Sequence, residues 1–214
     1  MILQVLNEIC GVKEFSSNLV NLIFKKANNK IEAGVSPYIK ISDSISEIEQ
    51  DAFYKYSDLK AIIIPKSIKK INSFAFGFTY IKSIIIPESV SFIGPGILQY
   101  CIYLEKVLIN TKLLTDIAVG SFFNCSKLLS ISIPEGVTII RESTFVCCRS
   151  LKSVFLPDSL KVINNYAFFR CSSLERVIFP ETMKGRDGSM SFSECVNLDE
   201  ETRNKINNIP LLSI

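Results

Sequence analysis

The 214-residue sequence contains no histidine. A Ser-His-Asp triad, a Cys-His pair and a zinc site with mixed cysteine and histidine ligands are therefore excluded. A zinc site built from cysteines alone needs paired CxxC motifs, and none occurs; Cys147 and Cys148 are neighbours without a second pair. We accordingly expect no metal, no other cofactor and no catalytic activity.

Long apolar runs are also missing. Hydrophobic residues make up 48% of the sequence, but no run approaches the roughly 20 apolar residues that a membrane-spanning helix needs. The opening residues, MILQVLNEICGVKEF, carry Glu8 as their first charge and have no small-residue cleavage site, so they do not predict a secretory signal. We expect a cytoplasmic protein, with a surface location by an unusual export route as the alternative.

Charge of one sign is not concentrated in any segment. The formal net charge is +3 and the pI is near 8.4. No basic block is interleaved with aromatic residues, as nucleic-acid-binding segments often are, so we expect no nucleic-acid partner. Asp116, Glu142 and Asp187 are isolated from one another, which favours solvated surface carboxylates over an acid–base site.

What the sequence does have is an internal repeat. A short apolar run ends in a fixed position, here called the mark, at intervals of 22 to 24 residues. The mark is proline five times and serine or asparagine twice: Ser42, Pro65, Pro87, Asn110, Pro134, Pro157 and Pro180. Proline has no N–H for a strand ladder, and serine and asparagine bond the local backbone in turns, so each mark predicts the end of a strand.

Other columns keep the same register. Three residues before each mark stand Ile39, Ile62, Ile84, Val107, Ile131, Val154 and Val177. About eleven residues after it stand Phe53, Phe76, Leu98, Phe122, Phe145, Phe168 and Phe192. Short runs rich in β-branched residues predict strands. Stacking such coils at roughly 4.8 Å buries one continuous core, which a single thin coil cannot do alone.

The repeat pattern, IPxSVxxIxxxAFxxCxxLxxIxIP, resembles the BspA-like leucine-rich-repeat family. It is clearest in SIPEGVTIIRESTFVCCRSLKSVFLP and LPDSLKVINNYAFFRCSSLERVIFP. The predicted fold is α/β to mainly β: a right-handed leucine-rich-repeat solenoid of about seven coils, with short strands in a parallel sheet and helical caps. The resemblance also implies adhesion or host contact, since known relatives are often surface or secreted proteins with such roles.

Both ends fall outside the repeat, which predicts three parts: residues 1–35, 36–198 and 199–214. In SSNLVNLIFKKANNKI, residues Leu19, Leu22, Ile23 and Ala27 share one helical face, which predicts an N-terminal helical cap, with a partner-docking helix as the alternative. The segment LDEETRNKI has acidic residues first and Lys205 later, matching the helix dipole, and predicts a C-terminal helical cap.

Five of the seven cysteines occupy one repeat column: Cys101, Cys125, Cys148, Cys171 and Cys195. Stacked coils place such residues about 5 Å apart, within disulfide range for the α-carbons but long for parallel β-carbons. A ladder of buried thiols is the interpretation we prefer. Disulfides between coils and a cysteine-bound metal are the alternatives.

A candidate interface comes from the column two residues before each mark, where alternation points side chains outward. Its members are Lys40, Ile63, Ile85, Leu108, Ser132, Phe155 and Ile178. The neighbouring column contributes Tyr38, Lys106 and Arg176. Outward positions of a solvated sheet are normally polar, so the apolar stripe Ile63, Ile85, Leu108, Phe155 and Ile178 favours a binding surface.

Three interpretations of this stripe are open. The leading hypothesis is a non-catalytic protein-binding repeat module, as in scaffold or adhesion proteins, with Tyr38, Lys106 and Arg176 flanking the contact. The first alternative is a self-associating structural protein that forms a homodimer through the stripe. The second is that the stripe only strengthens the sheet, because β-branched residues favour any strand. An enzyme is the least favoured class.

Overall fold

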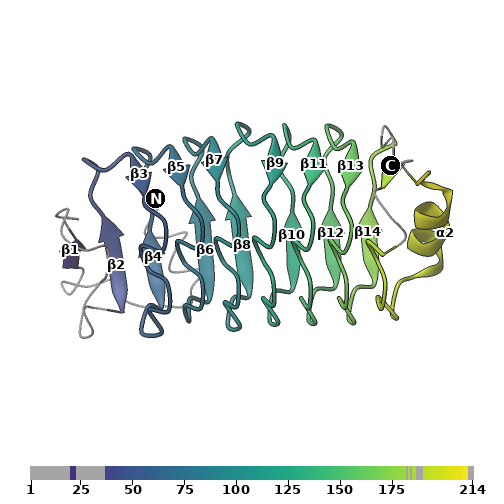
Figure 1. Ribbon diagram of the computed structural model, residues 1–214, viewed down its shortest axis with the longest axis horizontal. Coiled ribbons are helices and arrows are strands. Elements are labelled where there is room, and N and C mark those ends of the chain that lie inside the picture. The colour runs from purple at the N-terminus through teal and green to yellow at the C-terminus, as the bar shows by residue number, and fades with distance from the viewer. Residues whose placement is uncertain (1–19, 23–36, 182, 184, 187–189, 212–214) are drawn as a thin grey trace.

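Stacked parallel strands build the protein into a solenoid, as the repeat predicts (Figure 1). The computed structural model describes residues 20–22, 37–181, 183, 185–186 and 190–211. A first sheet runs along one side. Its strands are β2 (Tyr38–Ile41), β4 (Ala61–Ile63), β6 (Ser83–Ile86), β8 (Lys106–Ile109), β10 (Ser130–Ser132), β12 (Ser153–Phe155) and β14 (Arg176–Ile178). They pair in the groups β2-β4, β6-β8 and β10-β12-β14, which follow one another along the same side. Each of these strands ends one or two residues before its mark, which confirms the register.

A second set of short parallel strands was not anticipated from the sequence. Its members are β3 (Glu47–Ile48), β5 (Lys70–Ile71), β7 (Phe92–Ile93), β9 (Asp116–Ile117), β11 (Ile139–Ile140), β13 (Val162–Ile163) and β15 (Gly185–Arg186). These strands pair in the order β3-β5-β7 and β15-β13-β11-β9. Each coil therefore offers two strand faces to solvent, and the core lies between them.

The core is a set of in-register apolar columns. All seven large residues eleven or twelve positions after the marks are buried, from Phe53 to Phe192. The ring centroids of Phe122 and Phe145 are 5.1 Å apart, and those of Phe145 and Phe168 are 5.0 Å apart, with nearly parallel planes. Aromatic stacking therefore joins the four coils from Phe122 to Phe192 and the two coils of Phe53 and Phe76, with Leu98 between the two stacks.

One coil departs from the expected packing. The repeat places Leu113 in the buried column three residues after the mark, but this side chain is exposed and Leu114 is buried instead. The interval from Asn110 to Pro134 is the longest one, at 24 residues. The extra residue lies between β8 and β9, so the next residue along takes the inward place. Thr111, also buried, donates a hydrogen bond from Oγ1 to the carbonyl oxygen of Val90 at 2.6 Å.

The cysteine column forms a ladder of buried, free thiols, as preferred from the sequence. Each Sγ donates a hydrogen bond to a backbone carbonyl oxygen in the preceding coil. Cys101 bonds Phe76, Cys125 bonds Leu98, Cys148 bonds Phe122, Cys171 bonds Phe145 and Cys195 bonds Phe168, all at 3.0–3.1 Å. Each of these carbonyls also accepts a hydrogen bond from the backbone N–H three residues further along its own coil. The thiol thus combines a compact apolar side chain with an additional hydrogen bond between adjacent coils.

Burial also affects the acidity of these thiols. It raises the pKa of Cys101 to about 11, because the thiolate would lose its hydration in the core. Burial raises the pKa of Cys125, Cys148 and Cys171 as well. These four thiols are therefore protonated at neutral pH, and they are poor nucleophiles and poor metal ligands.

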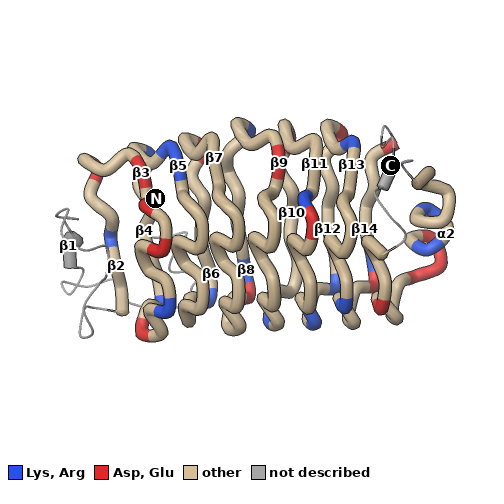
Figure 2. Tube along the Cα trace, viewed as in Figure 1, with Lys and Arg blue, Asp and Glu red and all other residues tan. Residues whose placement is uncertain are grey.

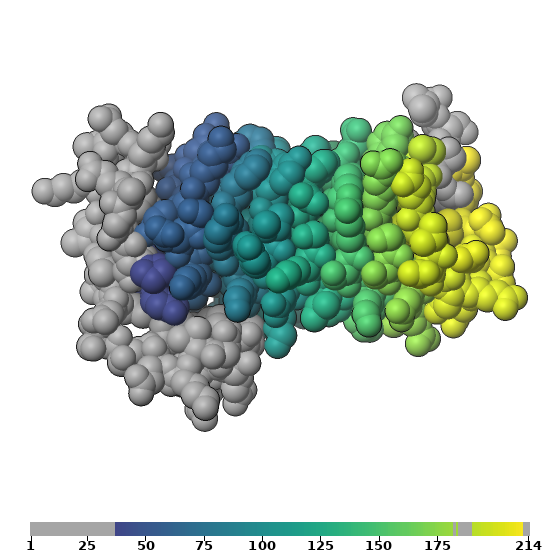
Figure 3. Space-filling model, turned by 90° about the horizontal axis from the view of Figure 1, so that it is seen from below, coloured from purple at the N-terminus to yellow at the C-terminus, as the bar shows by residue number. Residues whose placement is uncertain are grey.

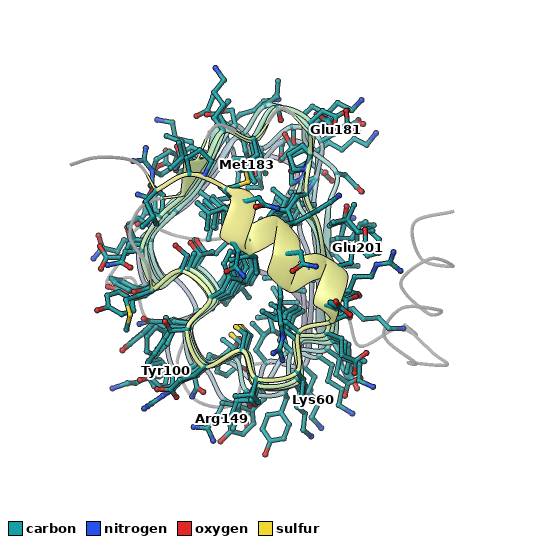
Figure 4. The ribbon with its side chains drawn as sticks, turned by 90° about the vertical axis from the view of Figure 1, so that its right-hand side faces the viewer. Lys60, Tyr100, Arg149, Glu181, Met183 and Glu201 are labelled. Carbon is teal, nitrogen blue, oxygen red and sulfur yellow. The ribbon has the colours of Figure 1, made fainter. Side chains whose placement is uncertain are left out.

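The predicted C-terminal helix is present as α2 (Glu200–Asn208). Asp199 is its N-cap residue, and its Oδ1 accepts a hydrogen bond from the backbone N–H of Thr202 at 2.7 Å. Thr202 and Ile206 are buried, and Thr202 Oγ1 accepts from the backbone N–H of Val177 in β14 at 3.2 Å. The helix lies across the end of the coil stack (Figure 4).

Near the N-terminus, the structure differs from the prediction of a helical cap. Val20–Leu22, which the sequence placed in a helix, form strand β1 and pair in parallel with β2. Pairing satisfies backbone groups that the edge of β2 would otherwise leave open, and this outweighs local helix propensity. The rest of residues 1–35 lies outside the described residues. Within the described part of the chain, no helix has the length and apolar character needed to cross a membrane.

Candidate binding surface

Strand pairing brings the stripe residues into line on the outer face of the first sheet. Ile85 is paired with Leu108 between β6 and β8. Further along, Ser132, Phe155 and Ile178 are paired in succession across β10, β12 and β14. Lys40 is paired with Ile63 at the N-terminal end. Within each of these three groups of paired strands, the column inferred from sequence spacing is therefore a row of neighbouring side chains.

The row is not uniformly exposed. Leu108, Phe155 and Ile178 keep 43%, 46% and 42% of their surface exposed. Ile63 and Ile85 are less exposed than these three residues, because they are half-buried. Their neighbours Ala61 and Ser83, which the alternation also points outward, are buried. The expected stripe of five exposed apolar residues is thus corrected to its C-terminal part, over β8 to β14.

The flanking residues divide in the same way. Lys106 and Arg176 are exposed beside Leu108 and Ile178, where the prediction placed them. Tyr38 is half-buried on β2 and lies at the other end of the sheet. Arg176 Nη2 lies 3.8 Å from Glu201 Oε2 on α2, and both side chains remain largely solvated. Such a pair is worth little in isolation, so the guanidinium can exchange this partner for another at low cost.

One apolar residue of this surface was missed. Leu129 is 45% exposed in the bend that leads into β10. Its position, five residues before the mark, is charged in the equivalent coils: Lys60, Lys82, Glu105, Lys152 and Glu175. A leucine at a position that is charged in these other coils was the sequence feature that could have identified this exposed residue. The exposed stripe, as the name is used from here on, therefore consists of Leu108, Leu129, Phe155 and Ile178.

Among the described residues, Asp116 and Glu142 do not form an acid–base site. Asp116 Oδ1 lies 3.4 Å from Arg141 Nε on the second sheet, and Glu142 is exposed in the following turn. Asp187 lies outside the described residues. No group of three or more metal-ligating side chains occurs among the residues whose placement is described.

A family model for the BspA type leucine rich repeat region matches this chain in six copies, over residues 35–118 and 99–210. The chain belongs to this family. The matched residues include every strand of the first sheet from β2 to β14. Members of this leucine-rich-repeat family are typically structural or interaction proteins, and nothing in the comparisons indicates catalysis.

Solved structures support the same fold. A leucine-rich repeat protein from Bacteroides ovatus is 25% identical, with a TM-score of 0.64, and the match covers 77% of this chain and 54% of that one. One from Eubacterium ventriosum is also 25% identical, with a TM-score of 0.67, over 74% of this chain and 43% of that one. The chain thus spans about half the length of these relatives. A search of curated proteins found no match.

Proposed function

We propose that this BspA-type repeat protein binds another protein through the exposed stripe on its first sheet. The observation that carries the proposal is the row of large apolar side chains at positions where a solvated sheet is normally polar. Leucine is not among the strand-favouring residue types, and Leu129 precedes β10, so strand propensity does not account for Leu108 or Leu129. A scaffold or adhesion role would use the surface in this way.

The energetics indicate what kind of contact this is. Fully burying a leucine, isoleucine or phenylalanine contributes ~1.5–3 kcal/mol. The four stripe residues are already about half-buried, so covering them would add on the order of 3–5 kcal/mol. Association costs ~4–15 kcal/mol in lost freedom. The stripe therefore anchors a complex that also needs polar contacts, and Lys106 and Arg176 are placed to supply them.

The test is a double substitution with a matched control. Leu108→Ser with Phe155→Ser removes two apolar anchors from exposed positions, so the fold stays intact while capture of a protein partner is lost. Phe92→Ser with Leu113→Ser makes the same chemical change at exposed residues away from the first sheet. The control variant should keep the partner. Equal capture of the partner by both variants would show that the exposed stripe is not part of the interface.

Self-association through the same stripe is the second candidate, because two identical apolar rows can cover each other. Light scattering on the purified chain separates the two. A dimer that dissociates on Leu108→Ser with Phe155→Ser, and not on Phe92→Ser with Leu113→Ser, supports self-association. A monomer that still captures a different protein supports the leading proposal.

A further inference from the structure

Basic and aromatic residues that are far apart in the sequence meet along one edge of the solenoid. This edge consists of the bends that lead into the strands of the first sheet, here called the strand-entry edge. Seen along the solenoid, Lys60 and Arg149 lie at this end of the coil cross-section, and Glu181 lies at the opposite end (Figure 4). Lysine and arginine positions recur along the same lower edge (Figure 2).

The backbone holds the residues of this edge in line. The N–H of Glu105 donates to the carbonyl oxygen of Lys82, that of Leu129 to Glu105 and that of Lys152 to Leu129, at 2.8–3.3 Å. One coil-to-coil ladder thus fixes the spacing of the charged side chains. Ser150 likewise donates its N–H to the carbonyl oxygen of Ser126, next to Lys127 and Arg149.

An apolar centre separates two groups of cations along this line. The rings of Tyr80 and Tyr103 meet edge to face with centroids 4.9 Å apart. Tyr80 is 46% exposed, and Tyr103 and Ile102 are each 36% exposed. Lys127 Nζ lies 4.9 Å from the Tyr103 ring centroid, which joins the second cation group to the apolar centre.

Lys60 and Lys82 lie on one side of this centre, and Lys127, Arg149 and Lys152 lie on the other. All five side chains are exposed. Within the part of the chain that the structure describes, none of the five forms an ion pair; the pairs present use Lys66, Arg141, Arg170 and Arg176. The apolar centre thus lies between two groups of cations. Asp58 and Glu105 lie in the same bends, so the five cations outnumber the carboxylates and leave the edge with a net positive charge.

We propose that the strand-entry edge binds an acidic protein segment that carries an aromatic or branched apolar residue between two groups of carboxylates. Tyrosine and arginine are the residue types that anchor protein interfaces, and complementary charge selects the partner. The edge from Lys60 to Lys152 crosses four coil intervals, or about 19 Å at the spacing of adjacent strands. An extended segment of about six residues covers that length.

The middle of the edge argues for a peptide rather than for a uniform polyanion. A sulfated polysaccharide or a nucleic acid carries negative charge on every unit, and its central units would face Ile102, Tyr103 and the carboxylate of Glu105. A protein segment can place its apolar residue there and its carboxylates at either side. This edge shares Leu129 with the exposed stripe. The substitutions below leave Leu129 unchanged, so the two surfaces can be tested independently.

Fluorescence anisotropy with the full chain tests the proposal. The probe is a fluorescein-labelled random copolymer of glutamate and tyrosine, compared with polyglutamate of the same length, heparin and oligothymidylate. The expected order is tightest binding to the copolymer, weaker binding to polyglutamate, and a decline for both as salt rises. Tighter binding to heparin or oligothymidylate, or no binding to the copolymer, would overturn the proposal.

Variants then place the site. Lys127→Glu, Arg149→Glu and Lys152→Glu together should weaken copolymer binding by about tenfold or more, because like charges then face the carboxylates. The control, Lys69→Glu, Lys70→Glu and Lys161→Glu, makes the same charge change at exposed positions on the second-sheet side and should bind much more tightly than the first triple. Equal losses of copolymer affinity in the two triple variants would show that binding depends on net charge alone, and would overturn the proposed site.

Two further variants keep the test decisive. Tyr80→Ser with Tyr103→Ser should abolish the preference for copolymer over polyglutamate while leaving polyglutamate binding unchanged. If the preference for copolymer over polyglutamate were unchanged, the apolar centre would not be part of the binding site. Leu108→Ser with Phe155→Ser should leave copolymer binding intact, so this edge and the stripe succeed or fail separately. Thermal melting by circular dichroism confirms that each variant is folded.

Discussion

Substituting Phe145 tests whether the solenoid is held together by its aromatic column. Phe145 is fully buried and stacks on Phe122 in the preceding coil and Phe168 in the following one. Phe145→Ala removes a whole ring from a site with neighbours on both sides, where collapse is limited. A buried phenylalanine changed to alanine costs ~3–5 kcal/mol. We expect a loss in that range, because both stacking contacts disappear with the ring.

The assay is urea unfolding followed by far-ultraviolet circular dichroism, with the free energy of unfolding taken by linear extrapolation. Phe155→Ala is the matched control. It makes the same change at a side chain that is 46% exposed on the first sheet, so it loses only the half of the ring that the fold already buries and should cost about 1 kcal/mol. Phe145→Leu should cost about 1 kcal/mol, since Leu98 already occupies the equivalent place in its own coil.

The ranking of the three variants is the test. A loss below about 1 kcal/mol for Phe145→Ala would fall outside the range for buried rings and would mean that the column does not carry the core. A loss for Phe155→Ala as large as that for Phe145→Ala would mean that the first-sheet face is part of the core, and it would remove the basis for a binding stripe there.

Two further predictions concern the thiols and the C-terminal helix. Native-state alkylation of Cys101, Cys125, Cys148 and Cys171 at neutral pH should be slow and become fast in denaturant, because burial raises each pKa and shields the sulfur; fast native labelling of several would contradict the ladder. Asp199→Ala should lower the stability of α2, because the cap to Thr202 is lost. That cap also lowers the pKa of Asp199 below its ordinary value of 3.8, so its contribution is present at neutral pH and is lost as the pH falls through the lowered pKa. An acid-induced loss of helical signal in Asp199→Ala equal to that in the native chain would contradict this role.

The periodicity of the sequence predicted the coil register because equivalent side chains of successive coils pack against one another in the same way. The phenylalanine and cysteine columns follow from that alone, since every member must meet its equivalent in the next coil. The register failed at Leu113, where one inserted residue shifts the inward position to Leu114. The second sheet was missed because its strands are two residues long and leave almost no alternation to detect.

The candidate surface was harder to predict than the core. Outward columns could be assigned by alternation, but exposure differs along one column: Ile85 is half-buried and Leu108 is exposed, although the two are paired. Leu129 lies in a bend, where alternation gives no direction. The strand-entry edge draws one or two residues from each of five coils, so no contiguous segment of the sequence contains its basic and aromatic residues together.

Photo-crosslinking from the stripe tests the proposed interface most directly. A photoreactive phenylalanine analogue replaces Phe155 in one variant and Phe92 in another. The two positions have the same residue type and the same exposure, 46%, but belong to the first and second sheets respectively. We expect a covalent adduct with a protein, either a partner or a second copy of this chain, from position 155 and none from position 92. Adducts from both positions alike, or from position 92 alone, would contradict it.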